Sequence, residues 1–224
     1  MMNALVTGAS SGIGKAIAQK LLSLGYQVYG LARDFDKCEI AHPHFIPIMI
    51  DLKSTKSYPD IAELKILVHA AGIGHFAPHE SLSTQQIEEM ITLNLTAPLL
   101  LTHHYLRALK KSEGYLFQIH SISGITPAPF GAVYGASKAG LAHFGTSLFK
   151  EARKSGLKVI NIAPDITKTP FFDDLHFCQS DDESTYIEAE DIAQVIEDVL
   201  ALRQGTVITD ITIQPQKFQI KKKK

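Results

Sequence analysis

The sequence predicts a single α/β domain of the doubly wound kind, with a seven-stranded parallel sheet and helices on both faces. Short runs rich in β-branched and aromatic residues alternate with longer amphipathic runs, as expected for successive βαβ units. The 224 residues are 45% hydrophobic and 20% charged, which is an ordinary composition for a globular protein with one substantial core. We find no linker or internal repeat, so residues 1–216 are interpreted as one domain.

The first half of the chain contains four of the seven predicted strands, in the runs NALVTG, QVYGLA, FIPIMID and KILVHAAG. A helix from about Ile13 to Leu24 separates the first two runs. Gly25 ends this helix, because glycine readily takes the left-handed conformation just past a helix end. A longer helical pattern covers residues 83–111.

The second half supplies the other three strands, in the runs GYLFQIHS, LKVINIAP and GTVITDITI. A helix rich in small residues is predicted over 132–155, before Gly156, and another from about Asp191 to Leu202.

Two segments of the second half fit neither strand nor helix. Residues 168–187 have no clean period and mix three phenylalanines with acidic residues. We interpret this segment as a loop that covers the site, with a disordered surface insertion as the alternative. Residues 217–224 are expected to form a basic, flexible tail.

Charge and cysteine content argue against several functional classes. A formal net charge of −1 gives no basis for a nucleic-acid partner. Cys38 and Cys178 are too few for a disulfide framework or a four-ligand zinc site, and the histidines are interpreted as packing or solvated residues. No apolar run approaches about 18 residues, and the N-terminus shows no secretory pattern. We therefore expect a cytoplasmic protein with neither membrane nor metal.

A glycine-rich turn lies between the first strand and the first helix, in NALVTGASSGIGKAIAQKL. Glycine lets backbone amides approach a pyrophosphate, and the helix N-terminus offers free N–H donors and a positive dipole end. The turn alone is a weak signal, but its position after a strand and before a helix favours nucleotide binding. The residues assigned to the cofactor here are Gly8, Ser10, Ser11, Gly12, Ile13 and Gly14.

Tyr134 and Lys138 are four residues apart in a predicted helix and therefore share one face. A tyrosine needs help to exchange protons near neutral pH, because its ordinary pKa is about 10, and a nearby ammonium lowers that pKa. From the spacing alone, the two residues would be interpreted as exposed neighbours without a shared function. Three glycines in the same helix, Gly135, Gly140 and Gly145, indicate instead that another element or a ligand approaches closely.

The motifs TGASSGIG and YGASK, about 120 residues apart and in this order, resemble the short-chain dehydrogenase/reductase (SDR) family. The resemblance covers nearly the whole chain. It implies a Rossmann-like fold and a hydride transfer between NAD(P)(H) and a carbonyl or alcohol substrate. It also implies that Tyr134 is the acid or base and that Lys138 lowers its pKa and holds the cofactor ribose.

Two more catalytic residues follow from the resemblance. Ser121, thirteen residues before the tyrosine, would bond the substrate oxygen, with Ser123 as the alternative. Asn94 would complete a proton relay through its main-chain carbonyl. Pro98 supports this independently, because proline lacks the N–H that would bond the carbonyl four residues earlier, although it could merely kink the helix.

The second strand predicts the choice of cofactor. Where similar proteins carry an acid that bonds the adenosine ribose, this chain has Ala32, followed by Arg33 and Asp34. Arginine attracts a 2′-phosphate and the aspartate partly opposes it. NADP(H) is therefore favoured, with NAD(H) as the alternative.

The resemblance assigns further cofactor contacts after the third, fourth and sixth strands. Asp51 would hold the adenine, although it could instead be a helix N-terminal acid. His69 and Ala70 replace the asparagines that are usual in the family, and Asp165 replaces its usual glycine. The remaining residues implied at these positions are Leu52, Ala70, Ala71, Gly72, Pro164, Ile166 and Thr169.

The sequence therefore predicts an NADP(H)-dependent enzyme acting on a small carbonyl or alcohol. The helices over 83–111 and 132–155 carry enough apolar and small residues to pack against symmetry mates, so a homodimer or homotetramer is expected. The alternative function is a non-catalytic regulator on the same fold that senses NADP(H).

Overall fold

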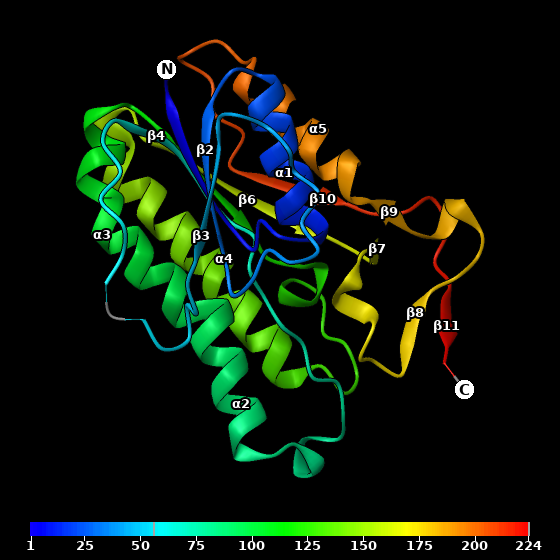
Figure 1. Cartoon of the computed structure of the whole chain (residues 1–224). Helices are drawn as coiled ribbons and strands as arrows, with labels where there is room; N and C mark the ends of the chain where they lie inside the picture. The colour runs from blue at the N-terminus through cyan, green and yellow to red at the C-terminus, as the bar shows by residue number, and fades with distance from the viewer. Residues whose placement is uncertain (56, 224) are drawn as a thin grey trace.

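The computed structural model describes residues 1–55 and 57–223 and contains the predicted parallel sheet (Figure 1). Its strands run in the order β10-β6-β5-β4-β1-β2-β3, and every pairing in it is parallel. All seven predicted strands are present, so the fold class is confirmed. They are β1 (Asn3–Thr7), β2 (Gln27–Ala32), β3 (Phe45–Met49), β4 (Leu64–His69), β5 (Tyr115–Ile119), β6 (Lys158–Pro164) and β10 (Asp210–Ile213).

Helices cover both faces of the sheet (Figure 1). One face is packed by α1 (Gly12–Ser23) and α5 (Ala189–Leu200). The other is packed by α3 (Ala97–Lys111) and α4 (Ala132–Ala152), with α2 (Thr84–Ile91) leading into α3. These bounds lie within three residues of the predicted ones, except that the predicted long helix is interrupted by a π-helical turn over Thr92–Thr96.

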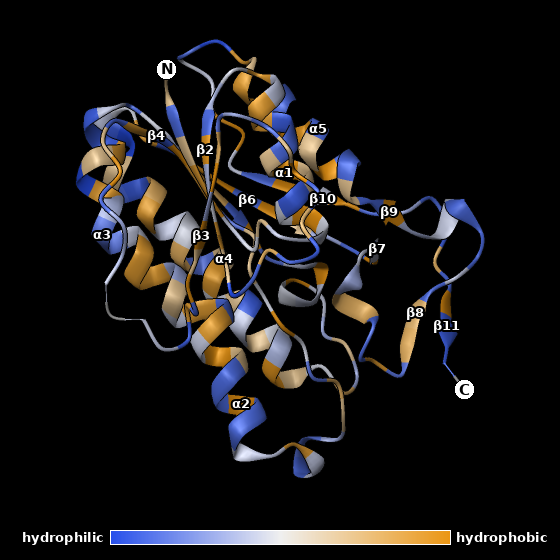
Figure 2. Cartoon of the chain, in the orientation of Figure 1, coloured by the Kyte–Doolittle hydropathy of each residue, from blue (hydrophilic) through white to orange (hydrophobic). Residues whose placement is uncertain are grey.

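Two hydrophobic layers hold the sheet between the helices. Val6, Phe117 and Ile160 face α1 and α5, whereas Leu5, Leu67 and Leu116 face α3 and α4. All six side chains are fully buried. Figure 2 shows the same pattern, with hydrophobic residues concentrated on the strands and hydrophilic ones on the outer turns of the helices.

The strand order brings the functional segments to one edge of the sheet. The chain starts in the middle with β1, builds outward through β2 and β3, and then crosses over to β4 on the other side of β1. In open α/β sheets ligands bind at this reversal point, outside the carboxyl ends of the strands. Residues assigned to the site lie in the segments that follow all six strands from β1 to β6.

The three glycines of α4 allow close approach, as predicted. A Cβ atom on Gly135 would lie 2.8 Å from the Ser123 carbonyl oxygen. One on Gly140 would lie 3.1 Å from the Leu95 side chain, and one on Gly145 would lie 2.2 Å from Asn161 Oδ1. Small residues on this helix therefore serve packing rather than helix propensity.

The C-terminal residues, which the sequence analysis expected to form a flexible tail, include a short strand. Ile220–Lys222 form β11, which pairs antiparallel with β8 (Phe177–Gln179) inside the 168–187 segment. Lys221 is 2.7 Å from the Asp181 carboxylate, and Lys223 donates to the Phe172 and Asp173 carbonyls. Lys221 and Lys223 thus have local acceptors, which composition alone does not reveal. Lys224 lies outside the described residues.

The 168–187 segment contains short strands where the sequence predicts a loop. Besides β8 it contains β7 (Thr167–Lys168 at its start) and β9 (Ile187–Glu188), which pair parallel with each other. Within the described part of the chain, no helix is both long and apolar enough to span a membrane. Among residues 1–55 and 57–223, no group of three or more His, Cys, Asp or Glu side chains could hold a metal ion.

Candidate active site

The glycine-rich turn after β1 has the geometry of an anion cradle. Gly8 and Gly12 have positive φ angles of 69° and 51°, which favour glycine. A Cβ atom on Gly14 would lie 2.2 Å from the Gly8 carbonyl oxygen, so the turn closes tightly on the helix. Ser11 is the N-cap residue of α1 but makes no side-chain capping bond. The first N–H groups of α1 thus lack a side-chain partner, which suits a bound pyrophosphate.

Thr7 joins this turn to the segment after β4. Its hydroxyl accepts the Ala70 and Ala71 N–H groups, each at 3.0 Å, and donates to the Val68 carbonyl. A Cβ atom on Gly8 would lie 3.0 Å from the backbone of Ala71. The sequence analysis missed Thr7. Its position as the last residue of a strand, directly before the first glycine of the turn, is the signal that could have found it.

His69, one of the departures from the family pattern, is a structural residue. It is buried at the end of β4, and its Nε2 lies 2.8 Å from the Thr102 hydroxyl on α3. Burial lowers the pKa of His69 to about 3, so the imidazole is neutral at physiological pH. The side chain thus links the sheet to α3.

His69 predicts an acid-sensitive fold. Because its pKa is lowered in the folded state, the unfolded chain binds more protons between about pH 3 and pH 6.5, and stability is lost as the pH falls through this window. At pH 5 the loss attributable to His69 is about 2 kcal/mol. We expect urea unfolding to show this extra loss, relative to pH 7, in the wild type but not in His69→Asn. The exposed His79→Asn serves as the control, and an equal loss in His69→Asn would refute the assignment.

Tyr134 and Lys138 are both buried on the first turns of α4. The Lys138 Nζ lies 5.8 Å from the centre of the Tyr134 ring and donates to the Ile119 carbonyl at 3.1 Å. Burial raises the pKa of Tyr134 to about 12, while hydrogen bonding by Ser121 acts in the opposite direction. Burial lowers the pKa of Lys138 to about 8. The pair is therefore enclosed, unlike two neighbouring side chains on a helix surface.

Ser121 and Ser123 follow β5 beside the tyrosine. Ser121 is buried, and its hydroxyl accepts the Ser123 N–H at 3.1 Å. Ser123 is less buried, and its carbonyl lies against Gly135 of α4. Of the two serines, only Ser121 contributes hydrogen bonding to the Tyr134 pKa.

Asn94 lies in the π-helical turn and is fully buried. Its Oδ1 accepts the Ile73 N–H, and its Nδ2 donates to the Ile73 carbonyl and to the Ser137 hydroxyl. These bonds fix Asn94 between the segment after β4 and α4. Pro98 follows in the first turn of α3 and removes the N–H that an α-helix would direct at the Asn94 carbonyl.

Gly72 is the point where these groups meet. A Cβ atom there would lie 3.2 Å from Lys138 Nζ and 3.3 Å from Asn94 Oδ1. The structure thus brings together the segment after β4, the π-helical turn and α4. Ser137, which accepts from Asn94 and donates to the Tyr134 carbonyl, is a second residue that the sequence analysis missed.

The segment after β6 lies against the glycine turn. Pro164 ends β6, and a Cβ atom on Gly12 would lie 3.2 Å from the Thr169 side chain. Asp165 neither clashes nor stands free, because its carboxylate accepts the Ile166 N–H at 2.8 Å and the Gln214 amide at 3.3 Å. The Ile166 carbonyl accepts the Ile187 N–H. Both backbone groups of Ile166 are therefore already bonded.

The residues assigned to the adenosine end follow β2 and β3. Arg33 is exposed directly after β2, and the Ile50 N–H donates to the Ala32 carbonyl next to it. The Asp51 carboxylate accepts the Lys53 N–H at 2.9 Å, so it caps a turn rather than a helix. Leu52 is buried in the same hydrophobic layer as Ala71.

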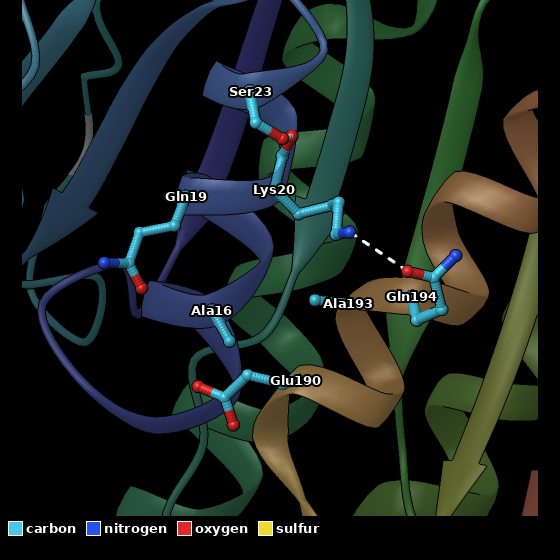
Figure 3. Close-up of a pocket in the computed structure, with 7 residues that line it drawn as sticks. All are labelled: Ala16, Gln19, Lys20, Ser23, Glu190, Ala193 and Gln194. Atoms are coloured by element: carbon cyan, nitrogen blue, oxygen red, sulfur yellow. Dashed lines mark hydrogen bonds between the residues drawn. The ribbon is translucent and has the colours of Figure 1, made fainter.

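Figure 3 shows a hollow between α1 and α5, remote from this chemistry. Lys20 crosses it to bond Gln194 and Glu197 on α5. The hollow contains none of the residues assigned to the site, and small side chains such as Ala16 and Ala193 line its floor. We interpret it as a gap between two packed helices.

The fold and this edge define a dinucleotide-binding protein of the doubly wound α/β class. Residues 2–177 match the family model described as short chain dehydrogenase, and the chain belongs to that family. As a member it is an oxidoreductase of CH–OH or C=O groups that uses a nicotinamide nucleotide.

Two curated relatives illustrate the match. An uncharacterized oxidoreductase of Staphylococcus epidermidis is 31% identical over 95% of this chain and 96% of that protein. Serine 3-dehydrogenase of Agrobacterium fabrum is 31% identical over 75% of this chain and 72% of that protein.

Solved structures agree on the fold. An alcohol dehydrogenase of Thermococcus sibiricus, complexed with 5-hydroxy-NADP, has a TM-score of 0.86 at 24% identity and covers 98% of this chain and 99% of its own. A metagenomic short-chain oxidoreductase in complex with NADP has a TM-score of 0.76 at 28% identity, with 96% and 97% covered.

Proposed function

We propose that this protein is an NADP(H)-dependent oxidoreductase that interconverts a carbonyl compound and its alcohol, with Tyr134 as the acid and base. One observation carries the proposal: Ser121, Tyr134 and Lys138 are buried together at the carboxyl edge of the sheet, with Lys138 next to Gly72 in the segment after β4. NADPH, when bound, supplies the hydride that reduces the carbonyl carbon, and is itself oxidised to NADP⁺.

The protein's own residues would orient the substrate and transfer the proton. Ser121 donates a hydrogen bond to the carbonyl oxygen, and Tyr134 delivers a proton to that oxygen as it gains charge. A phenol with a pKa near 12 is fully protonated at neutral pH, which suits a proton donor. The Lys138 ammonium stabilises the phenolate that remains, and a proton from solvent restores the phenol.

Asn94 would connect this group to solvent. Its side chain is fixed by Ile73 and Ser137, and its main-chain carbonyl, which Pro98 deprives of the usual partner, is proposed to hold the water that re-protonates the site. Pro164 and Thr169 are proposed to position the nicotinamide carboxamide. Because both backbone groups of Ile166 are bonded, that residue would act through the shape of the turn.

The cofactor preference is proposed to depend on Arg33. The metagenomic relative that is 28% identical is in complex with NADP. Here Arg33 is exposed directly after β2, where its charge attracts a 2′-phosphate and the neighbouring Asp34 partly opposes it. Asp51 and Leu52 are proposed to line the adenine.

Replacing Arg33 with alanine is expected to lower kcat/KM for NADPH by about tenfold to a hundredfold, because a charge-assisted phosphate contact is lost. The value for NADH should change less than threefold. Steady-state kinetics with both cofactors measure this, and Arg107→Ala, an exposed arginine on α3, is the control. A wild-type protein that preferred NADH would contradict the assignment of Arg33.

The direct test of the proposed function is oxidation of NADPH in the presence of a panel of aldehydes and ketones. We expect NADPH consumption to equal alcohol formation, and to be lost in a variant that lacks the Tyr134 hydroxyl. Nucleotide binding without such turnover across the panel would favour the NADP(H)-sensing regulator. Relatives named as dehydrogenases do not favour that alternative.

We also propose that the enzyme is a cytoplasmic homodimer or homotetramer. On α3, the large apolar side chain of Leu100 is 51% exposed, as expected of a residue that a second subunit covers. Light scattering of the purified protein measures the oligomeric state, and a monomer at micromolar concentration would contradict the proposal.

A further inference from the structure

Tyr134 is covered by aromatic side chains from two other segments. The Phe76 ring lies 5.1 Å from the Tyr134 ring, and the Phe171 ring lies 5.9 Å from it, centre to centre. Phe177 packs edge-on to Phe76 at 5.2 Å. These spacings are those of favourable aromatic pairs. The rings come from the loop after β4 and from the 168–187 segment.

The backbone leaves space for these rings. A Cβ atom on Gly74 would lie 2.7 Å from both Phe76 and Phe171, so a larger residue there would displace them. The rest of the cluster around Tyr134 is apolar and includes Met90, Val133 and Ile73. Apolar side chains therefore cover the Tyr134 ring.

Phe130 extends this surface to the solvent. It is 61% exposed, and its φ of 62° is an unusual backbone conformation for a bulky residue. Its carbonyl accepts the Ala77 N–H, which holds it next to the Phe76 segment. An exposed aromatic ring on a strained backbone is the kind of feature that persists where a ligand is bound.

Two charged side chains of the 168–187 segment, Lys168 and Asp181, form ion pairs at the surface. Lys168 pairs with Glu188, and Lys221 pairs with Asp181, with all four side chains well exposed. The pKa of Tyr134 is dominated by burial rather than by a neighbouring charge. A zwitterion or carboxylate held at the phenol would need paired charges, because burying an unpaired ion is costly.

We propose that the substrate is a neutral ketone or aldehyde, or its alcohol, that bears an aromatic ring, and that Phe76, Phe171 and Phe177 form its binding wall. This inference rests on the proposed function, since it places the substrate at Tyr134. The ring of the substrate packs against Phe76 and Phe171, and Phe130 forms the rim of the entrance.

The strand β11 positions the aromatic residues of the 168–187 segment. Lys222 is the register partner of Phe177, and Lys223 bonds the Phe172 carbonyl. The residues at the C-terminus thus hold the aromatic segment against the site. The wall is assembled from segments about a hundred residues apart in the sequence.

The test compares three ketones that differ in one group: 4-phenyl-2-butanone, 2-butanone and the charged 4-oxopentanoate. We expect kcat/KM with NADPH to be at least a hundredfold higher for the phenyl ketone than for the carboxylate. Phe76→Leu and Phe171→Leu should each raise KM for the phenyl ketone about tenfold, the scale of one lost aromatic contact. They should also lower the preference for the phenyl ketone over 2-butanone, measured as the ratio of their kcat/KM values, by about tenfold.

The matched control is Phe149→Leu. Phe149 lies on the same helix as Tyr134, about 22 Å further along, and packs in the layer under α3 and α4. This variant should leave KM for the phenyl ketone unchanged. If Phe149→Leu and Phe76→Leu raised this KM equally, the cause would be a general loss of packing. The proposal that Phe76 lines the substrate site would then be wrong.

A second readout does not need turnover. Calorimetric titration of the NADP⁺-loaded protein with 4-phenyl-2-butanone should show binding that weakens about tenfold in Phe76→Leu. If this binding is seen without turnover of any ketone, the result supports the role of Phe76 in substrate binding and contradicts the proposed catalytic function. If 4-oxopentanoate or L-serine is turned over best through Tyr134, or the phenyl ketone does not bind, the substrate inference is overturned.

Discussion

The Tyr134→Phe variant is expected to lose about a thousandfold or more of turnover while it binds NADP⁺ as the wild type does. The hydroxyl is the only part of the side chain removed, and it is the proposed proton donor. The ring itself packs between Phe76 and Phe171 in a buried cluster, so the fold should tolerate phenylalanine. The loss should appear in kcat, because the hydroxyl acts mainly as charge develops on the substrate oxygen.

Tyr115→Phe is the matched control for this experiment. Tyr115 is equally buried, on β5, and its ring stacks near Phe117. It should keep wild-type turnover. Calorimetry with NADP⁺ and urea unfolding check that both variants are intact. If Tyr134→Phe kept more than about a tenth of the wild-type rate, the proton would come from another group and the proposed role of Tyr134 would be wrong.

The fold was predictable because its signals are local. Each of the seven strands is a short apolar run bounded by polar or glycine residues, and Gly25 and Gly156 end helices with positive φ angles, as expected. What the sequence did not show is pairing between distant segments. The β8 and β11 strands are three residues each, and their partner is some forty residues away, so neither has a periodic signal of its own.

The site was predictable to the extent that it depends on motifs. Tyr134 and Lys138 could be found from spacing and from the family resemblance. Thr7, Ser137 and the ring of Phe76 could not, because their roles depend on which segments meet in space. A threonine or a phenylalanine in a sequence carries no sign of its neighbours.

Two departures from the family pattern have local explanations in the structure. His69 bonds Thr102 across the boundary between sheet and helix. Asp165 satisfies the Ile166 N–H, a bond that glycine could not make. Both substitutions place a polar side chain where it finds a nearby partner.

Lys138 is expected to oppose folding while it supports catalysis. Burial lowers its pKa from 10.5 to about 8, which means that the unfolded chain holds the proton more strongly. Below pH 8 the folded state bears the full penalty of about 3 kcal/mol, and the penalty disappears as the pH rises through 10.5. The hydrogen bond to the Ile119 carbonyl is worth about 1 kcal/mol in the other direction.

Lys138→Met should therefore be about 1 to 3 kcal/mol more stable than the wild type at pH 7, in the cofactor-free protein, and lose at least a hundredfold of turnover. The stability gap should shrink between pH 8 and pH 10, because only the wild type gains from deprotonating Lys138. Urea unfolding of both proteins at pH 7, 8 and 10 measures this, and the ionisable groups that do not interact with Lys138 cancel in the difference. Lys158→Met, a buried lysine on β6 that contacts the Tyr115 ring, should keep its turnover. If the two proteins were equally stable at pH 7, or if the difference between them did not depend on pH, Lys138 would not be a buried ammonium. Its proposed effect on the pKa of Tyr134 would then be wrong.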